Sequence, residues 1–131
     1  MSTIRLATLS VPVSNAERAL EFYRDGLGFT VVADVDMNPR QRWLQLAAPS
    51  GDTMIALVTW FERMTAGTLQ GMVIEVDDLD IEIAELRDRG VPIVGDPVEA
   101  PWARFVTFRD PDGNGWVLQQ RNAHPWEKLP R

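Results

Sequence analysis

The chain has 131 residues, of which 45% are hydrophobic and 24% charged, and its formal net charge is −6 at pH 7. This composition is typical of a globular domain and excludes a disordered chain. The acidity argues against nucleic-acid binding, which depends on clustered Lys and Arg. No apolar run approaches the roughly 20 residues that a membrane-spanning helix needs. The absence of Cys excludes disulfides, and with no evident signal peptide we expect a cytoplasmic protein.

The first half of the chain predicts a strand, a helix and three further strands. Asn15 is a good helix N-cap, and apolar residues then recur at helical spacing until Gly26 and Gly28 end the helix. An "APSG" turn separates the last two strands. The strands are expected at 4–13, 29–36, 41–48 and 53–60, followed by a polar link at 61–68.

The second half predicts the same order of elements. The stretch "RWLQLAAPSG" at 42–51 returns as "RFVTFRDPDG" at 104–113, and the segment 13–32 matches 76–94 with one residue deleted. Such an internal repeat indicates two copies of one structural unit. We expect a helix at 78–89, strands at 70–76, 91–98, 103–109 and 115–121, and an extended tail at 122–131 that includes the one histidine, His124.

Two βαβββ modules in tandem form the predicted fold, which is α+β. Each module covers one face of its sheet with its helix, so a second module is needed to close the other face. We expect one domain over 1–131, with module one at about 4–60 and module two at about 69–121. The two sheets are expected to curl towards each other around a concave cleft.

The sequence resembles the vicinal oxygen chelate superfamily, which includes glyoxalase I, extradiol dioxygenases and bleomycin-resistance proteins. The resemblance lies in "VPVSNAERALEFYRDGLGF", "IEVDDLDIEIAELRDRGV" and "PWARFVTFRDPDGNGWVLQQ", and it spans about residues 4–121. It implies the glyoxalase/bleomycin resistance fold. The fold alone does not indicate which activity of this superfamily the chain has, so the function has to be inferred from the residues of the site.

Members of this superfamily typically hold one divalent metal with four His, Glu or Gln side chains from four strands. The matching positions in this sequence are Thr8, Ala56, Gly71 (or Met72, if the register slips by one) and Val117. None of these side chains is a metal ligand of the kind that zinc or iron sites use. We therefore expect no metal and no cofactor.

Strand alternation predicts which side chains share the cleft with these positions. The surface would be apolar and aromatic with a few amides and hydroxyls, which suits a flat, partly apolar ligand. Stacking on aromatic rings would supply most of the binding. The predicted ligand-binding residues are Thr8, Ser10, Trp43, Gln45, Met54, Ala56, Val73, Trp102, Phe105, Thr107, Val117 and Gln119.

Other polar residues have a structural interpretation beside the functional one. Glu75 is either a solvated charge at a strand edge or a general base in the cleft, which makes it the one catalytic candidate. Arg42 and Arg104 occupy matched positions of the repeat, which favours structural pairing. The "DPDG" turn is explained by its Pro and Gly, and Trp116 alternates to the helix side of its strand.

The leading hypothesis is a metal-independent protein that binds a small aromatic or amphipathic molecule, as bleomycin-resistance proteins do when they sequester a drug. The alternative is a metal-free isomerase, cyclase or lyase that uses Glu75 as general base. A metal-dependent lyase or dioxygenase is a third interpretation, so whether the protein is an enzyme stays open. The resemblance also implies a homodimer, while the net charge and the lack of a long apolar run lead us to expect no nucleic-acid or membrane partner.

Overall fold

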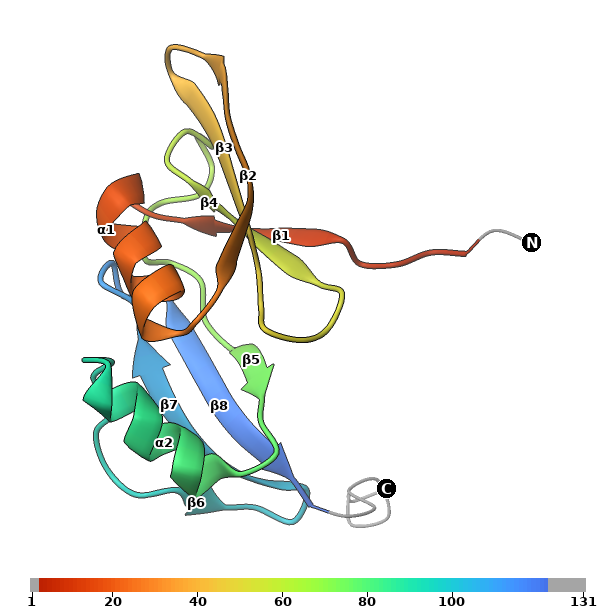
Figure 1. The fold of residues 1–131 in the computed structure, drawn as a ribbon, viewed down its shortest axis with the longest axis vertical. Coiled ribbons are helices and arrows are strands. Elements are labelled where there is room, and N and C mark those ends of the chain that lie inside the picture. The colour runs from red at the N-terminus through yellow and green to blue at the C-terminus, as the bar shows by residue number, and fades with distance from the viewer. Residues whose placement is uncertain (1–2, 123–131) are drawn as a thin grey trace.

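The computed structural model describes residues 3–122, so the predicted tail after Asn122, His124 included, lies outside these residues. Two four-stranded mixed sheets have the same internal order, β1-β4-β3-β2 and β5-β8-β7-β6 (Figure 1). In each sheet the first pair of strands is parallel and the others are antiparallel. This repetition confirms the predicted α+β fold of two βαβββ modules.

Module one follows the predicted order of elements. It consists of β1 (Thr8–Pro12), α1 (Ala16–Leu20), a π-helical segment η1 (Glu21–Gly26), β2 (Thr30–Asn38), β3 (Gln41–Ala47) and β4 (Met54–Val58). The Asn15 side chain accepts a 3.0 Å hydrogen bond from the backbone N–H of Arg18, which caps α1 as predicted. The first strand is shorter than the expected 4–13, and residues 3–7 run out from the body as an exposed arm (Figure 1).

Module two consists of β5 (Met72–Glu75), α2 (Leu79–Asp88), β6 (Val98–Glu99), β7 (Ala103–Arg109) and β8 (Gly115–Arg121). Asp78 caps α2 by accepting a 3.1 Å hydrogen bond from the backbone N–H of Ile81. The strand expected at 91–98 is wrong over most of its length. Pro92 and Pro97 have no N–H to donate to a ladder, and Gly95 has a positive φ of 89°, so pairing begins only at Val98.

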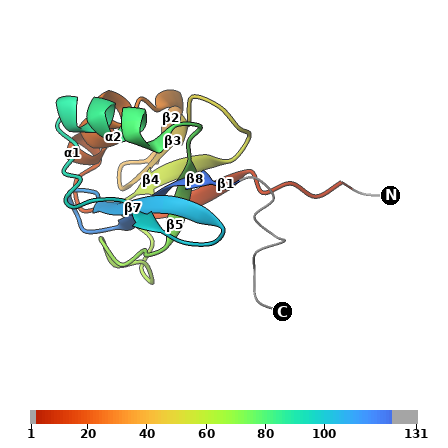
Figure 2. The same cartoon turned by 90° about the horizontal axis from the view of Figure 1, so that it is seen from below.

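Both helices lie on the same side of the strands (Figure 2). The side chains beneath them form one apolar core that draws on both modules, and it includes Leu44 and Leu46 of β3 together with Val106 and Phe108 of β7. These four residues were predicted to face the helices, and each is buried. Trp116 is also buried in this core, as predicted.

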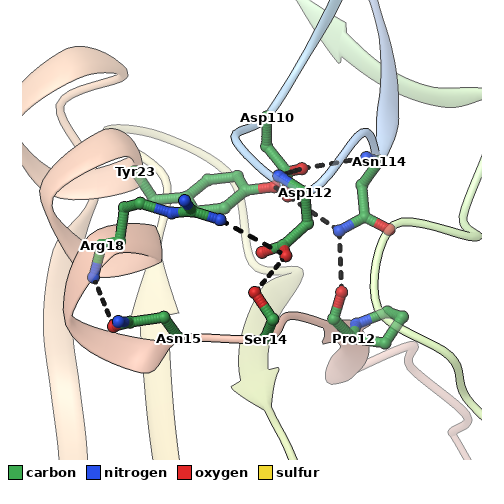
Figure 3. A network of polar contacts seen from close by, with 8 residues as sticks. All are labelled: Pro12, Ser14, Asn15, Arg18, Tyr23, Asp110, Asp112 and Asn114. Carbon is green, nitrogen blue, oxygen red and sulfur yellow. Dashed lines mark hydrogen bonds and ion pairs between the residues drawn. The ribbon is translucent and has the colours of Figure 1, made fainter.

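A buried polar network joins the two modules near α1 (Figure 3). The Tyr23 hydroxyl donates a 2.6 Å hydrogen bond to Asp110 Oδ2, and the Trp116 indole N–H donates to the Tyr23 oxygen at 2.9 Å. Asn114 Nδ2 donates to the Asp110 carboxylate and to the backbone carbonyl of Pro12. This network connects β1 and η1 of module one to the turn before β8 of module two. It therefore fixes the orientation of one sheet relative to the other.

Asp112 adds a second link between the modules in the same turn. Its Oδ1 accepts a 2.5 Å hydrogen bond from the Ser14 hydroxyl and lies 3.6 Å from the Arg18 guanidinium (Figure 3). The "DPDG" turn is therefore structural, as its sequence predicts, and both of its carboxylates bind groups of module one.

Candidate functional site

Six of the predicted site residues share one face of the first sheet, which we call the sheet-one face. Alternation places them opposite the side chains that α1 covers, and the strand register confirms that Gln45 of β3, Ala56 of β4 and Ser10 of β1 lie side by side. The buried Leu44 and Leu46 point the other way. The six residues are Thr8, Ser10, Trp43, Gln45, Met54 and Ala56.

Gln45 organises the polar groups of the sheet-one face. Its Oε1 accepts a 2.9 Å hydrogen bond from the indole N–H of Trp43. Its Nε2 lies 3.3 Å from Thr8 Oγ1 and 3.0 Å from Met54 Sδ. Because Trp43 is only half-buried, its ring is held in place by Gln45 while part of its surface stays accessible.

The sequence analysis missed one member of the sheet-one face, Val35 of β2, and close to it Met37, which stands at an irregularity of the strand pairing. Each is 52% exposed, and Val35 is the cross-strand neighbour of Trp43. Their alternation in "DVDMN" is a signal that could have found them. Two irregularities in the pairing of β2 with β3, after Val31 and after Asp36, make the face of each β2 residue hard to assign from sequence.

A second group of predicted residues lies on the corresponding face of the other sheet, the sheet-two face. The register puts Glu75, Gln119 and Phe105 in one cross-strand row. Trp102 precedes β7 and is 41% exposed. The strand residues of this face are Val73, Glu75, Phe105, Thr107, Val117 and Gln119.

Glu75 carries the carboxylate of the sheet-two face. It forms an ion pair with the guanidinium of Arg121, and Gln119 Nε2 lies 3.5 Å from its Oε1. Both partners of the ion pair are about half-exposed. Arg121 was not predicted, although it stands two residues after Gln119 and alternation puts both on the same face.

The two faces stay separate in one chain. Within residues 3–122 the sheets do not close on each other, so the single concave cleft expected from the sequence is not formed by one chain. The reason is that the polar network around Tyr23 and Asp110 holds the modules side by side, with both helices on the same side (Figure 2). Each sheet therefore presents half of the predicted site.

The four positions that match the family's metal ligands do not fit a divalent cation. Ala56 and Val117 have no donor atom, Gly71 has no side chain, and the Thr8 hydroxyl already lies within reach of Gln45. Across residues 3–122, no three side chains of the His, Cys, Asp or Glu type are grouped closely enough to hold a metal ion. No chemical step is therefore assigned to a metal here.

In the described part of the chain, no helix is both long and apolar enough to cross a bilayer.

The family model for the glyoxalase/bleomycin resistance protein/dioxygenase superfamily matches residues 5–118. The uncharacterized protein YetH of Bacillus subtilis is 30% identical over 119 residues, which cover 88% of this chain and 98% of YetH.

Solved structures of similar proteins point to the same superfamily. The crystal structure of TnmS3, an antibiotic binding protein from Streptomyces sp. CB03234, superposes with a TM-score of 0.85 and 41% identity, covering 93% of this chain and 99% of TnmS3. A superfamily member from Sphaerobacter thermophilus superposes with a TM-score of 0.82 and 32% identity, covering 90% and 98%. The chain therefore belongs to the glyoxalase/bleomycin resistance protein/dioxygenase superfamily.

Proposed function

We propose that this protein binds a small aromatic or amphipathic organic molecule, without a metal, on the sheet-one and sheet-two faces, and that it sequesters an antibiotic or a similar drug. The observation that supports this most is its similarity over nearly the whole chain to TnmS3, an antibiotic binding protein. The residues of the two faces supply a chemistry that suits such a ligand.

Aromatic rings would supply most of the binding free energy. Trp43 and Phe105 are half-buried, so each is fixed by its neighbours while part of its ring remains open for stacking. The amides of Gln45 and Gln119 lie beside these rings and offer hydrogen bonds that orient a polar substituent. This combination of apolar surface and few polar groups is typical of small-molecule sites.

The contacts of Glu75 favour a ligand-binding role for the protein over a catalytic one. A general base must be free to take a proton from its substrate. The carboxylate of Glu75 is instead paired with the Arg121 guanidinium, which occupies it as an ion-pair partner. The metal-free isomerase, cyclase or lyase is thus the weaker of the two hypotheses.

We further propose that the protein works as a homodimer. One chain presents two half-sites on separate sheets, so a two-fold partner could set its sheet-two face opposite the sheet-one face of the first copy. Sedimentation is expected to give twice the 14.8 kDa of one chain at micromolar concentration. A monomer under these conditions would overturn the proposed dimer, but it would leave open the proposal that one sheet face binds the ligand.

A titration of purified protein with bleomycin and with a panel of planar aromatic antibiotics tests the binding function. Binding is expected to quench tryptophan fluorescence, and Phe105→Ala is expected to weaken it by about tenfold or more, since a buried aromatic contact contributes on the order of 1–2 kcal/mol. Phe61→Ala is the matched control, because Phe61 lies in the link between the modules. Equal loss in both variants, or no binding across the panel, would overturn the proposal.

A further inference from the structure

A cavity of about 1020 Å³ lies between the two modules, mostly on the helix side of the strands. It is bounded by the turn at 48–53, by β1 and β5, and by α2, and Figure 2 shows this turn beside α2 on the helix side. The strand residues that line it include Leu9, Ile55 and Leu118. These alternate with the predicted site residues of their strands, but Val73 and Glu75 of β5 line the cavity as well. The cavity, which we call the helix-side groove, therefore adjoins the sheet-two face at β5 and contains none of its residues from β7 and β8.

The floor of the helix-side groove is apolar. Ile55, Trp116 and Leu118 line it and are almost fully buried, with 6%, 5% and 1% of their surface exposed. Its walls add Leu9 and Ile81, which are 42% and 58% exposed. Apolar side chains left open to solvent in a concave surface are typical of a binding groove.

The rim of the groove is acidic, and none of the described residues that line it is basic. Two of its carboxylates have partners, since Glu75 pairs with Arg121 and Asp78 caps α2. The remaining four form no ion pair with any Lys or Arg of residues 3–122. They are Asp52, Asp77, Glu82 and Glu85.

Glu82 and Glu85 stand almost one turn apart on α2 and bring their carboxyl groups together. Partial burial raises the pKa of Glu82, and a hydrogen bond with Glu85 and the charge of that carboxylate raise the pKa further. Arg89 acts in the opposite direction but more weakly. Arg89 forms no ion pair with either carboxylate among the described residues, and the pair stands at the edge of an apolar floor.

We propose that the helix-side groove binds an amphipathic organic cation, with its apolar body against the exposed Leu9 and Ile81 and its charged nitrogen beside Glu82 and Glu85. The volume is at the upper end of the range of about 300–1,000 Å³ for small-molecule sites. The same carboxylates repel anionic compounds.

Two ions of nearly the same shape and opposite charge test this site. Calorimetric titration of the full-length protein is expected to show binding of tetraphenylphosphonium and none of tetraphenylborate. The double variant Glu82→Gln/Glu85→Gln should weaken tetraphenylphosphonium binding by about tenfold, because it removes both charges beside the cation. Equal binding of the two ions would overturn the proposal, because the acidic rim would then not favour a cation over an anion.

A control with the same change in net charge is Glu21→Gln/Glu62→Gln, because both of these carboxylates lie outside the groove. It should leave the affinity for tetraphenylphosphonium nearly unchanged. Equal weakening in the two double variants would show a general charge effect and overturn the proposal. Weakening by Phe105→Ala would place the cation on the sheet-two face instead, so failure here is distinguishable from failure of the proposed function.

Discussion

The Tyr23 hydroxyl and the Asp110 carboxylate, 87 residues apart in the chain, meet in a buried hydrogen bond of 2.6 Å between the two modules. The phenol also accepts the indole N–H of Trp116 and packs against that ring at a centroid distance of 5.8 Å. One side chain of module one is thus held by two of module two. This contact decides how the two half-sites are oriented.

Tyr23→Phe is expected to destabilise the protein by about 1–3 kcal/mol, because it leaves the Trp116 N–H without its acceptor in a buried site and removes one donor from Asp110. Urea unfolding followed by circular dichroism measures the change. Thr59→Val is a control, since it removes a hydroxyl from an exposed position. A loss no larger than that of the control would mean that the contact does not contribute to stability.

The same residue predicts how stability depends on alkaline pH. Burial, followed by the nearby Asp110 carboxylate, raises the pKa of Tyr23 far above its usual range. The folded protein keeps this proton while the unfolded chain loses it above about pH 10. Stability from this group is therefore complete below about pH 10 and falls by about 1.4 kcal/mol for each pH unit above it.

Tyr23 is the one tyrosine of the chain, so tyrosinate absorbance reports on it alone. We expect this absorbance to appear only together with unfolding, and the alkaline loss of stability to be smaller in Tyr23→Phe. A reversible titration near pH 10 in the folded protein would contradict the buried hydrogen bond.

Two glycines with similar backbone conformations provide a matched test of the module junction. Gly67 has a φ of 82°, and an added Cβ would lie 2.0 Å from the backbone oxygen of Asp112. Gly71 has a φ of 76° and nothing within 4 Å of such a Cβ. Both Ala variants are strained at positive φ, but Gly67→Ala should cost about 1–3 kcal/mol more, because it also forces the modules apart. Equal melting temperatures for the two variants would show that the junction is not closely packed there.

Glu75→Gln separates binding from catalysis. The ion pair with Arg121 is about half-exposed, so its loss should change the free energy of unfolding by less than about 1 kcal/mol. We expect the variant to keep its affinity for aromatic ligands in the fluorescence titration. If a reaction is found and this variant abolishes it while binding persists, the general-base hypothesis replaces the binding hypothesis.

The repeat in the sequence predicted more of the fold than composition could. Arg42 and Arg104, matched in the repeat, have matched partners, because Arg42 pairs with Glu17 and Asp34 while Arg104 pairs with Asp80 and Glu99. In both modules the guanidinium joins the start of the helix to a strand of its sheet. The structural interpretation of these two residues is confirmed.

The arrangement of the modules could not be predicted, because it depends on contacts without a local signal. Nothing in the spacing of Tyr23 and Asp110 indicates that they meet. The helix after Leu20 is also π-helical, with the Leu27 N–H bonded to the Phe22 carbonyl at 3.1 Å, although its residues have ordinary helical spacing. Alternation predicted which residues share a face, but which two faces meet depends on tertiary and quaternary contacts.

The most direct test of the central claim is a calorimetric titration of chelator-treated protein with the best ligand of the antibiotic panel, compared with Trp43→Ala. The account predicts full affinity without any added divalent metal and a loss of about tenfold or more in the variant. The account would be contradicted if the protein bound the ligand only after a divalent metal was added back, and if Trp43→Ala left the affinity unchanged.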